Sequence, residues 1–232
     1  MKKIWTLIAC TLMAATLSFA QDGEGSRANQ EKKIGVGARG AFDYGIMYGF
    51  KDEDDDVDGS PAGIGFEGGL MLRIQMIPNL HFAPEVNVAY VSTSHKWDGL
   101  KRTYTSTDIE IPLLIRGTVA DKFYVTAGPQ AVLNISNDSD IEIKSEYDNG
   151  DYEEKLNQAK FTFGLAAGFG YNIFAGLFVD ARFYMGLMEL YPDVKSPSDD
   201  ITSIADAEYF SYISMEGAKM MKIKVGLSYW FI

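Results

Sequence analysis

The acidic stretch between residues 51 and 60, KDEDDDVDGS, has the side-chain types and spacing of a metal-binding loop. Asp54, Asp56, Asp58 and Gly59 spell D-x-D-x-D-G, the opening of an EF-hand calcium loop. A complete loop of that kind needs a bidentate glutamate at its twelfth position, which is Gly65 when counted from Asp54. The sequence therefore predicts no metal site of high affinity. Weak divalent-cation binding by the three aspartates stays open as an alternative.

The two histidines offer little for catalysis. His81 lies at the start of a predicted strand, where a solvated or ion-paired histidine is ordinary. His95 lies in a predicted polar loop near Ser92, Ser94 and Asp98, a set that could support Ser–His or Asp–His hydrolysis. A loop has no rigid element to orient such a triad. We therefore predict no catalytic residue, no enzymatic activity and no bound cofactor.

The first 20 residues have the pattern of a secretory signal peptide. Lys2 and Lys3 precede an apolar run, and a small-x-small cleavage signal ends at Ala20. Removing the two lysines changes the formal net charge from −11 to −13, which disfavours binding of nucleic acid. We predict three parts: a signal peptide at 1–20, a short periplasmic segment at 21–33 and a β-barrel domain at 34–232.

The elements that must position any site are strands, because apolar residues recur at every second position. From residue 34 the even positions are apolar up to Phe50, with one glycine among them, while the odd positions are small or charged. The pattern appears in eight segments: 34–50, 63–77, 80–91, 107–119, 123–135, 161–173, 177–188 and 219–232. Eight is an even number, as closure of an antiparallel barrel requires.

The connections between the eight segments alternate between short and long. Those at 78–79, 120–122 and about 173–176 are tight, whereas 51–62, 92–106, 136–160 and 189–218 are long and polar. Short turns on one side and long loops on the other are typical of outer-membrane proteins. The sequence predicts an all-β fold, an eight-stranded antiparallel up-and-down transmembrane β-barrel with long extracellular loops and short periplasmic turns.

The non-apolar face of these strands combines small residues with balanced charges. A soluble barrel would instead present a face rich in Lys and Glu to water. Buried charges persist only when they are paired, so the matched set predicts an ion-pair network inside the barrel. Its predicted members are Arg39, Asp43, Glu67, Arg73, Glu85, Asp108, Glu110, Arg116, Asp180, Arg182, Lys222 and Lys224.

Several stretches resemble the small porin-like outer-membrane β-barrels called PorT-like. They are DIEIPLLI at 108–115, AGP at 127–129, GLAAGFGY at 164–171, DARFY at 180–184 and GLSYWF at 226–231. The last stretch is similar to the C-terminal signal read by the barrel-insertion machinery, although the chain ends in Ile232 and not in an aromatic residue. The resemblance implies the fold, carries no catalytic residue across, and implies no single function.

These observations predict a non-enzymatic outer-membrane protein with a lumen filled by side chains. It would act in envelope structure or surface interaction through acidic extracellular loops. The alternative is a narrow porin, a transport barrel or a barrel associated with secretion. The expected partners are outer-membrane lipid, the barrel-insertion machinery and an unidentified envelope or surface protein, with no nucleic acid. The chain is expected to be a monomer without a cofactor, weak divalent-cation binding aside.

Overall fold

The computed structural model describes residues 34–50, 60–97, 100–120, 122–144, 149–154, 158–174, 176–192 and 217–231. These residues form nine β-strands: β1 (Ile34–Tyr48), β2 (Ala62–Ile77), β3 (Leu80–Trp97), β4 (Leu100–Ala120), β5 (Phe123–Lys144), β6 (Asn149–Glu154), β7 (Phe161–Phe174), β8 (Leu177–Gly186) and β9 (Lys219–Trp230). Within these ranges, no helix has the length and hydropathy needed to cross a membrane.

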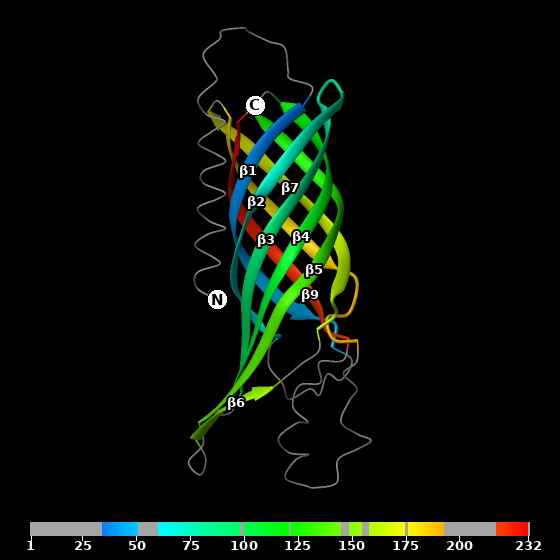
Figure 1. Ribbon diagram of the computed structural model, residues 1–232. Coiled ribbons are helices and arrows are strands. Elements are labelled where there is room, and N and C mark those ends of the chain that lie inside the picture. Colours follow the sequence, from blue (N-terminus) through cyan, green and yellow to red (C-terminus); the bar gives the residue numbers. More distant parts are fainter. Residues whose placement is uncertain are drawn as a thin grey trace.

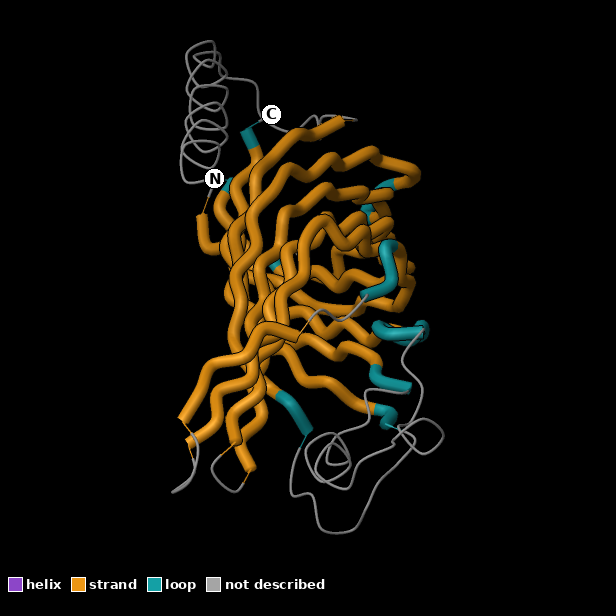
Figure 2. Tube along the Cα trace, turned by 60° about the horizontal axis from the view of Figure 1, so that its bottom comes forward, coloured by secondary structure: helices purple, strands orange, loops and turns teal. Residues whose placement is uncertain are grey.

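Eight of the strands close into an antiparallel barrel. The sheet order is β4-β3-β2-β1-β9-β8-β7-β5-β6, and an additional β4–β5 pairing joins its two sides. Among the described strands β6 pairs only with β5, along Ser139–Lys144, and adds a short strand to the sheet beyond the barrel. Figures 1 and 2 show the strands winding around a common axis. The predicted fold class, an eight-stranded antiparallel barrel, is confirmed.

The outer surface of the barrel is a continuous apolar band. Phe42 is 79% exposed and Phe66 is 58% exposed, while their neighbours Ala41 and Glu67 point inward and are buried. Side chains alternate between the two faces of a strand, so a period-two sequence places its apolar residues on one side of the wall. An apolar exterior around a polar interior is the arrangement of a membrane barrel.

The strands meet in tight turns at the end of the barrel that carries the C-terminus (Figure 1, top). Asn79, between β2 and β3, has a φ of 66°, and Gly176, between β7 and β8, has a φ of 82°. Asparagine and glycine adopt this left-handed conformation more readily than other residues, which allows the chain to reverse within a few residues. By the arrangement typical of outer-membrane barrels, this is the periplasmic end.

Two of the segments predicted as long loops are strands for most of their length. β3 and β4 stay paired from Tyr90↔Thr107 to Trp97↔Leu100, so 92–106 is a β-hairpin. β5 continues to Lys144 and pairs with β6, and the two strands together occupy more than half of 136–160. The loop prediction was wrong there because polar residues interrupt the apolar alternation once strands leave the membrane. The extended strands β3 to β6 form a sheet that projects from the barrel (Figure 1, bottom).

Glycines that point inward let the wall pack closely, and two neighbours on β2 make this testable. A Cβ added at Gly69 would lie 2.1 Å from the Val86 carbonyl oxygen and 2.6 Å from the Asn87 Cα, whereas at Gly68 the nearest atom would be 3.8 Å away. We expect Gly69→Ala to lower the free energy of unfolding by about 1–3 kcal/mol, the usual effect of overpacking.

The matched substitution Gly68→Ala places its methyl group on the exposed outer face. It should leave stability unchanged or raise it slightly, since alanine loses less conformational entropy than glycine in a strand. The measurement is urea unfolding of both variants in lipid vesicles. Equal stabilities of the two variants would contradict the close approach at Gly69.

Candidate functional site

The lumen is the part of the molecule where polar side chains gather. Alternate residues of all eight barrel strands point into it, and their buried charged and amide groups come from β1, β2, β3, β4, β5, β8 and β9. The buried set includes Arg39, Asp43, Glu67, His81, Glu85, Asn87, Asp108, Glu110, Arg116, Gln130, Asp180, Arg182, Lys222 and Lys224. A membrane barrel hides these groups from lipid, and each therefore needs a partner inside.

Two arginines organise one half of the network. The Arg39 guanidinium donates to Glu67 and, at 2.7 Å, to an oxygen of Asp180. Arg182 donates to Glu85 at 2.7 Å, and its Nε lies 3.1 Å from an Asp180 oxygen. Asp180 thus lies between two guanidinium groups, and the planar arginine head can contact two carboxylates at once. The chain of contacts joins β1, β2, β3 and β8 across the lumen.

Two lysines from β9 organise the other half. Lys222 donates to Glu110 at 2.7 Å, and Lys224 donates to Glu110 as well and to Glu67 at 2.5 Å. Gln130 adds a hydrogen bond of 2.8 Å to Glu110, whose side chain is fully buried. Asp43 lies 3.9 Å from the Lys224 ammonium, beyond hydrogen-bond distance.

The carboxylates of Asp43, Glu67 and Glu110 are close enough together to be considered as ligands of a metal ion. One oxygen of each lies within 4.8 Å of the others. The Lys224 ammonium lies among them and donates hydrogen bonds to two of the three. The chain therefore places its own positive charge where a metal ion would otherwise be needed, and the donor set does not favour a metal.

The periplasmic mouth is filled by aromatic rings. Met71, Tyr124, Phe178 and Trp230 form a buried cluster, in which the Tyr124 and Phe178 rings meet edge to face. The Arg116 guanidinium lies 3.5 Å from the Tyr124 ring centre and 4.7 Å from that of Phe178. Arg116 was expected beside carboxylates; its contacts are instead cation–π contacts, which are favourable when desolvated.

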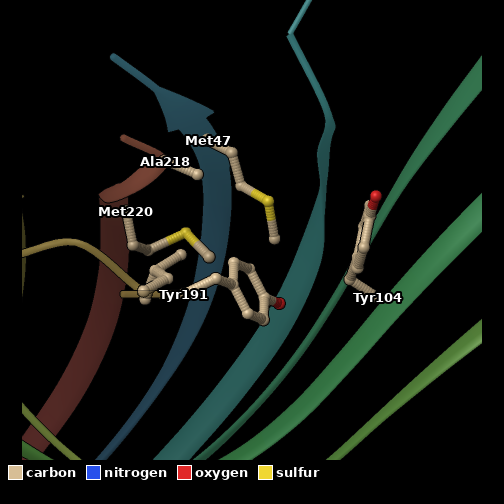
Figure 3. Packing of buried hydrophobic residues seen from close by; sticks show 6 residues of the cluster. Met47, Tyr104, Tyr191, Ala218 and Met220 are labelled. Atoms are coloured by element: carbon tan, nitrogen blue, oxygen red, sulfur yellow. The ribbon is translucent and has the colours of Figure 1, made fainter. Parts of the chain in front are cut away.

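A segment that follows β8 packs into the opposite mouth. Leu190 and Tyr191 pack against Met47, Tyr104 and Met220, with Ala218 beside them (Figure 3). The Leu190 backbone is fixed on both sides, because its N–H donates to Ala218 and its carbonyl accepts from Ala159. Tyr191 is only 3% exposed. Apolar side chains therefore cover the charged layer on this side as well.

The remaining predicted site residues either make other contacts or lie outside the described residues. Asp108 accepts hydrogen bonds from Ser106 and Asn134, and Arg73 lies over the Trp230 ring. Asp54, Asp56 and Asp58 lie outside the described residues.

The hydrolase set considered around His95 is not assembled on β3. Ser92, Ser94 and His95 lie in a regular strand, where alternate side chains point to opposite faces, so the serines and the histidine are separated by the wall. Asp98 lies outside the described residues. The predicted loop was therefore wrong, and with it the proximity on which the hydrolase alternative depended.

Sequence reasoning missed the neutral residues that complete the lumen. Asn87 and Gln130 each contact a buried carboxylate, and Tyr124, Leu190 and Tyr191 help to close the mouths. Asn87 and Gln130 lie on the inward face of strands, which is the signal that could have found them. Leu190 and Tyr191 follow the last residue of β8 and have no strand periodicity to reveal them.

A comparison with known protein families agrees with this architecture. The profile of the family described as "Outer membrane protein beta-barrel domain" matches residues 19–191. The comparison with curated proteins found no match.

Solved structures with a similar fold include Neisserial surface protein A, at 12% identity, 84% and 96% coverage of this chain and that one, and a TM-score of 0.49. Ail, the attachment invasion locus protein of Yersinia pestis, has 10% identity, coverages of 84% and 98%, and a TM-score of 0.41. CarO of Acinetobacter baumannii has 14% identity, coverages of 87% and 99%, and a TM-score of 0.40.

Proposed function

Because the chain belongs to the outer membrane protein β-barrel domain family and lies in the outer membrane, we propose that it is a sealed, non-enzymatic barrel that acts through its extracellular surface. The observation that carries this proposal is the filled lumen. An apolar cluster lies at each mouth, and hydrogen-bonded ion pairs lie between them. Eight strands enclose an interior that side chains can fill, and the two clusters with the ion pairs between them support such filling here.

The surface beyond the membrane is where the protein presents specific structure. The sheet extension of β3 to β6 projects from the barrel (Figure 1) and is held by regular backbone pairing. Segments 51–60 and 136–160 are rich in Asp and Glu, while 92–106 contains Lys96, Lys101 and Arg102. A largely negative rim with one basic hairpin suits cationic partners, or divalent ions that bridge it to anionic lipid head groups.

The role is therefore envelope structure or interaction with a surface or envelope protein, exerted by a monomer without a cofactor. The finer assignment to the PorT-like group is supported by the motif resemblance alone. A narrow transport barrel is the competing function. It needs a continuous path for solute, and the observed contacts across the lumen oppose one.

Purified protein in a planar lipid bilayer should show no stable conductance steps. A porin inserted under the same conditions serves as the positive control, and circular dichroism of the sample confirms that the barrel is folded. Reproducible single-channel steps from folded protein would overturn the proposal that the barrel is sealed and would favour a transport function. Crosslinking on intact cells, followed by purification of this chain, then identifies the partner at the surface. The proposal requires that capture of this partner depends on the β3–β6 extension. A variant in which a short turn replaces residues 92–106 tests this dependence.

A further inference from the structure

The hydrogen-bonded core of the lumen is already neutral without Asp43. Its negative members are Glu67, Glu85, Glu110 and Asp180, and its positive members are Arg39, Arg182, Lys222 and Lys224. Each of these groups contacts at least one partner of opposite charge at hydrogen-bond distance. Asp43 is a fifth carboxyl group placed directly beside this balanced set.

Asp43 is also a carboxyl group without a hydrogen bond to this network. It is 2% exposed, and within the described ranges neither of its oxygens has a protein hydrogen-bond donor. The nearest ammonium, Lys224, is 3.9 Å away and already donates to Glu67 and Glu110. By contrast, Asp180 accepts from Arg39 and has Arg182 beside it, and Asp108 accepts from Ser106 and Asn134.

The charged groups facing Asp43 come from every side of the lumen. β9 contributes Lys222 and Lys224, β2 contributes Glu67, β4 contributes Glu110, and β1 itself contributes Arg39. The two nearby carboxylates repel a third negative charge, and the three cations already have carboxylate partners. An ionised carboxylate buried without hydrogen bonds is costly, and such a group is usually neutralised by binding a proton.

We propose that Asp43 is a proton-binding site, and that it carries this proton in the folded barrel at neutral pH. The proton removes a negative charge that has no hydrogen-bonded partner and converts one Asp43 oxygen from an acceptor into a donor. One oxygen each of Glu67 and Glu110 lies within 4.8 Å of an Asp43 oxygen, so acceptors are close to the new donor. A protonated Asp43 leaves four acids against four bases in the core. This inference does not depend on what the extracellular surface binds.

Infrared spectroscopy of the protein in lipid vesicles at pH 7 tests the proposal directly. The wild type should show the C=O stretching band of a protonated carboxyl group, and Asp43→Asn should lose it. Asp108→Asn is the matched control: it removes a carboxyl group from the same lumen but should keep the band. Absence of the band from wild type, or its persistence in folded Asp43→Asn, would overturn the proposal.

A second measurement distinguishes a proton from a metal ion. Where rising pH ionises Asp43 in the folded barrel, the urea midpoint of wild type should fall relative to that of Asp43→Asn, because a buried carboxylate without a hydrogen-bond donor then appears in the folded state. If calcium raises the melting temperature of wild type at pH 7 but not that of Asp43→Asn, the carboxylate is ionised and binds metal, and the proposal fails. Equal pH dependence of the two proteins would also contradict it.

Discussion

Arg182→Met is expected to lower the free energy of unfolding of the barrel by about 3–5 kcal/mol, the usual cost of leaving one partner of a buried ion pair alone. Arg182 is 8% exposed and contacts both Glu85 and Asp180. Asp180 keeps Arg39 in the variant, so the loss falls mainly on Glu85, which retains a hydrogen bond of 3.3 Å from Asn87. The measurement is urea unfolding of protein reconstituted in lipid vesicles.

Arg116→Met is the matched control, because it removes the same side chain from the same lumen without depriving a hydrogen-bonded carboxylate. Arg116 lies over the rings of Tyr124 and Phe178, and such contacts contribute about 2 kcal/mol when desolvated. We therefore expect the control to lose less stability than Arg182→Met. A loss of the same size in both variants would mean that side-chain volume, and not pairing, determines the effect.

The double variant Arg182→Met, Glu85→Leu separates the charge effect from packing. It removes both ends of one ion pair and leaves the Arg39–Asp180 contact intact. Replacing a buried pair with apolar residues is often neutral, so the double variant should recover much of the stability lost by the single one. If Arg182→Met is as stable as wild type, water in the lumen screens these charges and the network contributes little to folding.

The fold could be predicted from the sequence because strand alternation is a local property. Phe42 and Asp43 are neighbours, and period two alone places one towards lipid and the other towards the lumen. The contact partners could not be predicted in the same way. Arg39 meets Asp180 across 141 residues of chain, and their meeting depends on strand register and barrel tilt, which a hydrophobic pattern does not specify.

The sequence predicts the strands less well outside the bilayer, where the outward face of a strand need not be apolar. Inside the bilayer the outward face must be apolar, so alternation is strong in β1 and β9. Beyond it both faces of a strand can be polar, and the paired segments Ser92–Trp97 and Leu100–Ser106 were predicted as a loop. Tyr191, which closes a mouth, follows β8 without any repeat. The residues that determine access to the lumen are therefore the hardest to predict from the sequence.

A second large effect is expected from a substitution in the cluster at the extracellular mouth. Tyr191→Ala should expose the outer end of the lumen, because the ring packs in the cluster with Met47, Tyr104 and Met220. Truncating a buried aromatic side chain costs about 3 kcal/mol, and if this loss falls on local opening, the open population rises about a hundredfold. The backbone hydrogen bonds of Leu190 to Ala159 and Ala218 should remain, but the packed ring next to them is lost.

A thiol placed at Met47 reports this opening, because Met47 is 2% exposed and Cys10 is the only native cysteine of the chain. Met47→Cys alone should react slowly with a membrane-impermeant thiol reagent added to intact cells. Adding Tyr191→Ala should accelerate labelling by about two orders of magnitude, whereas Tyr191→Phe, which keeps the ring, should not. Asp138→Cys, on the exposed part of β5, controls for reagent access and should react at one rate in all backgrounds. If Met47→Cys reacts as fast with Tyr191 intact as without it, the mouth is already open, and the sealed barrel loses its outer closure.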